Sequence, residues 1–243
     1  MCTVTFVPQK GQGFILTSNR DEQASRSPEN ITKTTLYDQQ MLFPRDTEAG
    51  GTWIAVSDQN KVVCLLNGAF DLHRRTPPYR KSRGIMVLES FEYDSLQEFA
   101  ENYDFENLEP FTFVLIDNGT LAELRWDGTK KHYKKLDNRQ MHIWSSATLY
   151  DAETRKRREV WFEDWKKTHE NYNLSSILDF HKNAGDGDPW NDVIMNRLGM
   201  VQTVSITNVI NDQKGIAMHY HDLVNQAIKK AKINLEGEVV ESS

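Results

Sequence analysis

The sequence has few cysteines and no long apolar run. Cys2 and Cys64 are the only thiols among its 243 residues, which is too few for a disulfide framework. The start of the chain lacks the basic and apolar regions of a secretory signal. No stretch approaches the roughly 18 consecutive apolar residues of a membrane-spanning helix. We therefore expect a cytoplasmic protein with no integral membrane segment.

The chain also has no excess of positive charge, since its 29 Lys and Arg are outnumbered by 35 Asp and Glu and the formal net charge is -6. Nucleic-acid binding depends on clustered Lys and Arg, so this balance argues against a nucleic acid as partner. The longest basic run, residues 155–158, lies in a strongly helical stretch and is predicted to be a solvated helix face. A small-molecule ligand fits the composition better. The sequence sets no oligomeric state.

The pattern of strands and helices predicts the fold class. Hydrophobic residues make up 38% of the chain, enough for one folded domain over residues 1–243 with a mobile tail from about residue 236. Alternating apolar residues predict strands at 3–7, 13–18, 31–37, 50–58, 61–67, three runs within 111–136, and at 141–146, 203–210 and 215–221. Helical spacing occurs at 84–91, 96–103, 152–169 and 174–181. Hairpin-linked strands between helical blocks predict an α+β protein with largely antiparallel sheets stacked between outer helices.

The first two predicted strands form a hairpin with its turn near Gly11. Because cross-strand partners in a hairpin sum to a constant, residue 2 falls opposite a position close to 20. Cys2 is therefore expected beside Arg20 and Asp21, within the "NRDE" sequence that ends the second strand. The alternative is an incidental cysteine beside a solvated strand end.

Removal of Met1 is expected when the second residue is small, and it would make Cys2 N-terminal. The α-amine, with an ordinary pKa of about 7.7 to 8.0, could then act as general base for its own thiol. Arg20 would favour the thiolate, and Asp21 could orient the α-ammonium group by a hydrogen bond. This hairpin therefore predicts a nucleophile, a base and an orienting group in one place.

Four segments, in this order, resemble the NRDE family of transport and Golgi organisation protein 2-like proteins. They are Cys2-Thr3 before a strand, Asn19-Arg20-Asp21-Glu22, Gly50-Gly51-Thr52-Trp53, and the strand ending in Leu66-Asn67. The match is specific over roughly the first 70 residues. This part is also similar to the cysteine N-terminal-nucleophile (Ntn) hydrolases, which include choloylglycine hydrolases and penicillin V acylases.

The resemblance implies a four-layer αββα fold and the cleavage or transfer of an acyl group on a small amide. It implies that Cys2 carries the acyl group, that Arg20 and Asp21 flank it, and that Asn67 helps to form the oxyanion hole. We also expect Asn19 to bind the ligand. Two departures from the family pattern leave a second hypothesis open, namely a non-catalytic protein that binds or traffics a lipid, acyl or haem ligand. No cofactor is expected.

The first departure is Ser146, which stands where a second oxyanion Asn is expected and offers one hydroxyl hydrogen on a shorter reach. We expect it to bind ligand in that place. The second departure is that residues 202–205 contain no Arg that matches the late Arg of the hydrolases. Trp53 and its two preceding glycines are predicted to be mainly architectural, with a role in walling the pocket as the alternative.

Other motifs carry weaker signals. His219 and His221 share one face of a predicted strand, but no third ligand stands at a diagnostic spacing, so no metal site is predicted. The sequence at 186–189 lacks the further oxygen ligands of a calcium loop and is predicted to be a turn. Cys64 is expected to be a small buried hydrophobe, and the aromatic residues at 159–165 are expected to pack on a sheet.

Overall fold

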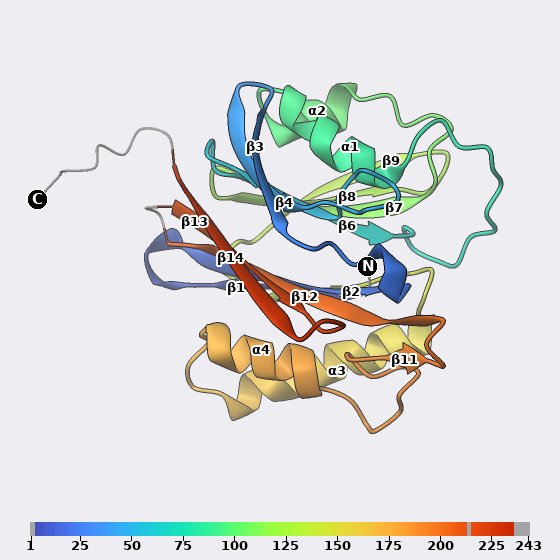
Figure 1. Ribbon diagram of the computed structural model, residues 1–243, viewed down its shortest axis with the longest axis vertical. Helices are drawn as coiled ribbons and strands as arrows, with labels where there is room; N and C mark the ends of the chain where they lie inside the picture. The colour runs from blue at the N-terminus through green and yellow to red at the C-terminus, as the bar shows by residue number, and fades with distance from the viewer. Residues whose placement is uncertain (1–2, 213–214, 236–243) are drawn as a thin grey trace, which may run out of the picture.

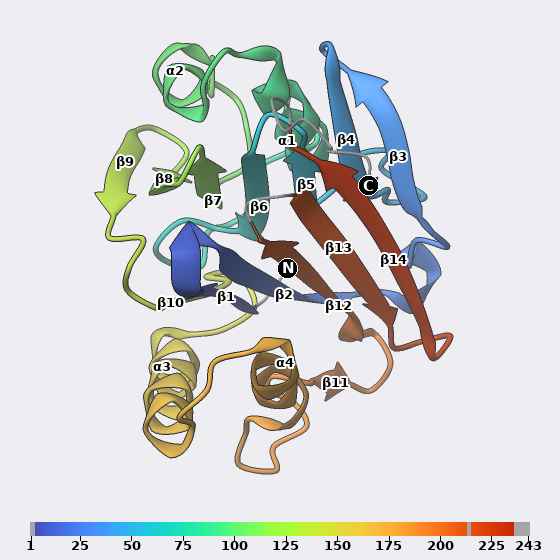
Figure 2. The same ribbon diagram turned by 90° about the vertical axis from the view of Figure 1, so that its left-hand side faces the viewer.

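The computed structural model describes residues 3–212 and 215–235. Within these residues, two seven-stranded antiparallel sheets stack face to face, and a pair of helices covers the outer surface of each (Figure 1). Figure 2 shows the same layers after a quarter turn, with α3 and α4 below one sheet and α1 and α2 above the other. This arrangement confirms the predicted four-layer αββα fold. No described helix is both long and apolar enough to cross a membrane.

The first sheet has the strand order β10-β1-β2-β12-β13-β14, with β11 paired to β12. Its elements and the two helices that cover it are β1 (Thr3–Pro8), β2 (Phe14–Glu22), β10 (His142–Ser145), α3 (Ala152–Thr168), α4 (Leu174–Asn183), β11 (Asn196–Arg197), β12 (Val201–Asn211), β13 (Gly215–Asp222) and β14 (Ala227–Asn234). The chain therefore returns to its N-terminal hairpin late, by placing β12 beside β2.

The second sheet runs in chain order from β3 to β9. Its elements and covering helices are β3 (Ile31–Leu36), β4 (Gln39–Pro44), β5 (Ile54–Ser57), β6 (Lys61–Asn67), α1 (Arg83–Glu89), α2 (Leu96–Asn102), β7 (Phe111–Asp117), β8 (Thr120–Trp126) and β9 (Lys131–Leu136). Every ladder between neighbours is antiparallel, as the hairpin turns of the sequence predict.

The N-terminal hairpin has the predicted register within the described residues. Thr3 pairs with Asn19 and Pro8 with Phe14, so paired residue numbers have a constant sum. The turn between the strands uses Gly11 at a φ of 71°, a left-handed conformation that glycine adopts without steric cost. Cys2 lies outside the described residues, and so does the predicted tail from about residue 236.

Alternation along β2 divides the hydrophobic residues between two cores. Leu16 packs between the sheets, whereas Ile15 packs under α3 and α4. Phe162 and Trp165 of α3 stack with ring centroids 5.5 Å apart in that second core, which confirms that the aromatic face of this helix packs on a sheet. Cys64 is fully buried between the sheets, and burial raises the pKa of its thiol to about 12.

One prediction for the basic run is wrong, because Arg158 is fully buried instead of solvated. Four consecutive residues span more than one turn of a helix, so one of them faces the sheet. The Arg158 guanidinium lies 3.7 Å from the Tyr150 ring centroid. Its terminal nitrogens donate hydrogen bonds, among them two from Nη2 to the carbonyls of Asn191 and Asp192, at 2.9 and 2.7 Å, which offset the cost of burying the charged group.

Candidate active site

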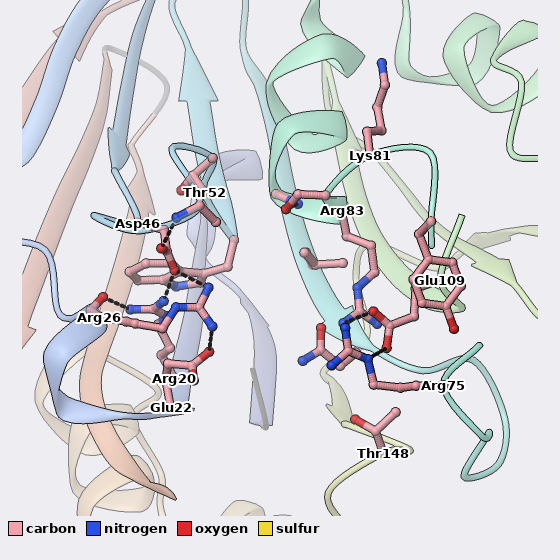
Figure 3. A pocket seen from close by; sticks show the side chains of 18 of the residues that line it. Arg20, Glu22, Arg26, Asp46, Thr52, Arg75, Lys81, Arg83, Glu109 and Thr148 are labelled. Atoms are coloured by element: carbon pink, nitrogen blue, oxygen red, sulfur yellow. Dashed lines mark hydrogen bonds and ion pairs between the residues drawn. The ribbon is translucent and has the colours of Figure 1, made fainter. Parts of the chain in front are cut away.

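A pocket of about 750 Å³ is lined by residues of both sheets at one end of the molecule. The end of β2 contributes to it, as do the segments before β5 and at the end of β6, the loop that follows β6, and the start of α1. Charged side chains occupy two walls that face each other across it (Figure 3). We call these groups the Arg20 cluster and the Glu109 cluster.

The Arg20 cluster consists of Arg20, Glu22, Arg26 and Asp46. Arg20 pairs with Asp46, donates a 2.6 Å hydrogen bond to the Arg26 carbonyl, and lies 4.2 Å from the Trp53 ring centroid. Arg26 donates to Asp46 at 2.7 Å and to Glu22 at 2.6 Å. Two cations and two carboxylates therefore form a closed network, in which each charge has a partner of opposite sign.

Burial and pairing act in opposite directions on the pKa values of this cluster. Burial has the largest effect on the Arg20 guanidinium and lowers its pKa, while Asp46 and Glu22 oppose the shift. Burial alone would raise the pKa of Asp46, but the Ala49 N–H and the two guanidiniums bring it below its ordinary value. Asp46 therefore stays ionised and holds the Arg20 side chain at the pocket wall.

Asn19 points to the opposite face of β2 and does not line the pocket. Its Nδ2 atom donates to the carbonyls of His181 and Val193, at 3.1 and 2.9 Å, and its Oδ1 accepts from His181 Nδ1 at 2.6 Å. The other ring nitrogen of His181 accepts from the Thr5 hydroxyl at 2.8 Å. This network suits a neutral imidazole, and burial lowers the His181 pKa to about 3.

Asp21 also faces the helical layer and does not line the pocket. Its two carboxylate oxygens accept from the Tyr150 and Thr203 hydroxyls, both at 2.6 Å. Arg20 and Asp21 are thus neighbours on one strand but serve opposite faces of it.

Of the three remaining candidates, Asn67 and Trp53 line the pocket, whereas Ser146 does not. Asn67 ends β6 and lines the pocket, as does Trp53. Ser146 is fully buried outside the pocket lining, and its hydroxyl donates a 2.8 Å hydrogen bond to the Asn67 carbonyl. Before Trp53, a Cβ added at Gly51 would lie 2.3 Å from the carbonyl carbon of Gly84 in α1, so this glycine permits close packing of the helix.

Cys2 lies outside the described residues, but its neighbour Thr3 is described. The Thr3 side chain bonds to Arg158 on the helical side of the first sheet, whereas Val4 packs between the sheets. Strand alternation therefore operates from the first described residue. Whether the Cys2 thiol reaches Arg20 and Asn67 stays a prediction.

The facing wall is the Glu109 cluster, which consists of Glu109, His73, Arg75 and Arg83. None of these residues was predicted from the sequence. Glu109 lies 3.3 Å from Arg75 Nε, 3.1 Å from Arg83 Nη2 and 3.4 Å from His73 Nε2. Burial lowers the pKa of Arg83, and Glu109 opposes the shift. The available signal was the basic sequence "HRRTPPYRKSR" in an acidic protein, but nothing local links it to a carboxylate more than 25 residues later.

The other sequence motifs lie away from these clusters. His219 and His221 are on β13 and are not part of the pocket lining. Among the residues that the structure describes, no three His, Cys, Asp or Glu side chains come together as a group that could hold a metal ion.

A model of the family described as Transport and Golgi organisation 2 matches residues 1–235. This chain belongs to that family. A comparison with curated protein sequences finds no significant match. Within the matched residues, Arg20 of the NRDE segment and Asn67 line the pocket, and Gly51 of the Gly-Gly-Thr-Trp segment packs against α1.

Comparison with solved structures shows the fold of this chain. A variant of conjugated bile acid hydrolase from Clostridium perfringens has a TM-score of 0.60 at 11% identity, over 99% of this chain and 94% of that chain. The Caenorhabditis elegans ortholog of N-acylethanolamine-hydrolyzing acid amidase has a TM-score of 0.55 at 12% identity, over 85% and 92%. At these identities the likeness shows the fold, which is the Ntn-hydrolase fold.

Proposed function

We propose that this protein is a cysteine Ntn amidohydrolase or acyltransferase that acts on a small acyl amide through Cys2 once Met1 is removed. The observation that carries the proposal is the shared pocket of Arg20 and Asn67, at the end of the hairpin where Thr3 pairs with Asn19. Two proteins of the same fold are named as hydrolases, one of conjugated bile acids and one of N-acylethanolamines.

Strand alternation supports a Cys2 side chain that faces the pocket. Because Val4 faces the second sheet and Thr3 faces the helices, a preceding residue that continues the strand would present its side chain on the pocket side. The Arg20 guanidinium faces the same side. A thiolate there would be stabilised by this cation and by the free α-ammonium group.

The proposed reaction has two stages. The α-amine takes the thiol proton, the Cys2 thiolate adds to the amide carbonyl, and Asn67 Nδ2 donates to the resulting oxyanion. The C–N bond then breaks, the amine leaves with the proton from the α-ammonium, and an acyl-thioester remains. Water or an acceptor amine attacks the thioester with the α-amine as base, which regenerates the thiol. An oxyanion donor such as Asn67 contributes about 3 to 4 kcal/mol to such a step.

Asp21 would orient the α-ammonium group in this scheme. It already accepts two hydroxyl hydrogen bonds, but a carboxylate has about four acceptor sites and so retains capacity for another donor. A thiol nucleophile also suits a reducing compartment, and the cytoplasm is the proposed location.

Intact-protein mass spectrometry tests the enzyme proposal. We expect a mature chain that begins at Cys2 and gains one acyl group when it is treated with an activated acyl ester. Cys64→Ala should leave the adduct unchanged, because Cys64 is fully buried with a raised pKa. A retained Met1, or an adduct that persists in Cys2→Ala, would rule the mechanism out.

Ser146 favours the alternative of a non-catalytic protein that binds or traffics a lipid, acyl or haem ligand. Its hydroxyl donates to the Asn67 carbonyl and so is not aimed at an oxyanion in the pocket. The alternative is supported if purified wild-type chains that begin at Cys2 form no acyl adduct and if the wild type and Cys2→Ala bind an acyl ligand with equal affinity.

A further inference from the structure

The pocket is more basic than the protein that contains it. Its described lining includes more cationic side chains than carboxylates, whereas the whole chain carries a net charge of -6. The cations are Arg20, Arg26, Arg75, Lys81 and Arg83, and the carboxylates are Glu22, Asp46 and Glu109. A local surplus of positive charge in a hollow of an acidic protein attracts an anion.

The surplus can be assigned to one wall. In the Arg20 cluster, two arginines are balanced by two carboxylates. Lys81 is balanced by Glu89, at 2.6 Å from its Nζ atom. In the Glu109 cluster, however, Arg75 and Arg83 share one carboxylate. Within residues 3–212 and 215–235, no second carboxylate lies within 4.0 Å of either guanidinium.

Both guanidiniums line the pocket, and the two differ in how much of each is available to a ligand. Arg83 is held by Glu109 and by the Pro110 carbonyl at 2.8 Å, and its side chain is 15% exposed. Arg75 is 71% exposed and reaches Glu109 through Nε, so the outer edge of its fork is not taken up by this contact. Figure 3 shows both arginines converging on Glu109 at the pocket wall that faces the Arg20 cluster.

This wall is next to the candidate oxyanion donor. The Pro110 carbonyl that accepts from Arg83 also accepts from the Gly68 N–H at 3.0 Å, and Gly68 directly follows Asn67. One carbonyl therefore joins the Arg83 guanidinium to the main chain beside Asn67. An unsatisfied polar group also lies here, since His73 Nδ1 is buried and has no hydrogen-bond partner among the described residues.

We propose that Arg75 and Arg83 form a subsite for an anionic group of the ligand, so that the substrate is an acyl amide bearing a carboxylate or phosphate near its scissile bond. A planar guanidinium pair matches both groups by paired, charge-assisted hydrogen bonds. The identification of the ligand as a substrate rests on the proposed function, whereas the anion subsite does not.

Equilibrium binding to Cys2→Ala protein tests the subsite without any turnover. Isothermal titration calorimetry would compare N-decanoylglycine with N-decanoylethanolamine, which has a hydroxyl in place of the carboxylate, and monodecyl phosphate with decanol. We expect the anionic member of at least one pair to bind about 10-fold more tightly. The pair with the larger ratio identifies carboxylate or phosphate as the preferred group. Equal affinities within both pairs would overturn the proposal.

Substitutions assign the preference to this wall. Arg75→Gln should lower the affinity for the preferred anion about fivefold and leave the neutral analogue unchanged. Arg74→Gln is the matched control, because it removes the same charge from the adjacent exposed residue, which does not line the pocket. Equal effects of the two variants, or no effect of Arg75→Gln, would contradict the assignment.

A substitution of Glu109 provides a test in the opposite direction. Glu109→Gln keeps a side-chain oxygen for the arginines but removes the charge that offsets them. Binding of the anion should become about threefold tighter, because the competing carboxylate is gone. Weaker anion binding by this variant, with an unchanged unfolding midpoint, would overturn the proposal. Failure of the Cys2 acylation test leaves these binding outcomes intact, so the two proposals can fail separately.

Discussion

The two faces of β2 use one short sequence for different purposes. Arg20 and Glu22 face the pocket and belong to a network of charges that the second sheet completes through Asp46. Asn19 and Asp21 face the helices and are enclosed by hydrogen bonds to His181, Tyr150 and other partners. The difference follows from strand geometry, which places alternate residues of one motif on opposite faces of the sheet.

The largest effect should come from breaking the helical side at Asn19. Asn19→Ala removes donors to two buried carbonyls and the acceptor for His181 Nδ1. Leaving such groups unpaired costs about 3 kcal/mol or more in unfolding free energy, which urea denaturation would measure. Asn183→Ala, at an exposed position of α4, should change stability little. Equal losses in the two variants would show that the Asn19 network is not structural.

Breaking the pocket side should instead affect chemistry more than stability. Arg20→Gln removes the cation that faces the proposed thiolate, while Arg26 remains to pair with Asp46. We expect the rate of Cys2 acylation to fall about 100-fold, as for loss of a charge that stabilises a reacting anion. The unfolding midpoint should move less than in Asn19→Ala. Stopped-flow labelling of Arg20→Gln and Asn19→Ala, corrected for the folded fraction of each, would measure the acylation rates. An unchanged acylation rate for Arg20→Gln would contradict the role assigned to Arg20.

The helical side also predicts a pH dependence of stability. The His181 pKa is about 3 in the folded protein, below its ordinary value of about 6.5, so the unfolded chain binds more protons between these values. Stability contributed by neutral His181 is therefore complete above about pH 6.5 and falls as the pH decreases, by up to about 1.4 kcal/mol per pH unit.

Denaturation of wild type and His181→Gln at pH 7.5 and 5.5 would measure this effect. The stability gap between the two proteins should narrow by about 1 to 2 kcal/mol at the lower pH. His221, whose pKa is lowered to about 4 mainly by burial, is present in both proteins and cancels in the comparison. A gap that stays constant would mean that the His181 pKa is the same in the folded and unfolded states.

The hairpin and the fold class could be predicted because their signals are local. Alternation and a glycine turn determine the pairing of Thr3 with Asn19. β4 was missed because its two-residue turn consists of Tyr37 and Asp38, both at positive φ, instead of the Asn-Gly type that marks such turns. β14 was missed because its lysines resemble a solvated tail, although charged residues are typical of an exposed edge strand.

The pocket could be predicted only on the side that the hairpin determines. Arg20 was predicted from the hairpin register and Asn67 from the family resemblance, and both line the pocket. The Glu109 cluster was not identified, because Arg75 comes from a loop without periodicity, Arg83 begins α1, and Glu109 lies beyond both α1 and α2. The burial of Arg158 was missed for a related reason, since a run of basic residues does not reveal which member faces the sheet.

The proposed function depends most directly on the reactivity of Cys2 inside this pocket. The measurement is the rate of covalent labelling of Cys2 by an activated acyl ester, followed by mass spectrometry with and without N-decanoylglycine or monodecyl phosphate as competitor. The proposed function predicts one adduct, on an N-terminal Cys2, and slower labelling when the preferred anion fills the Arg75 and Arg83 subsite. A chain that retains Met1, or a labelling rate equal to that of a free cysteine peptide and unaffected by either competitor, would contradict it.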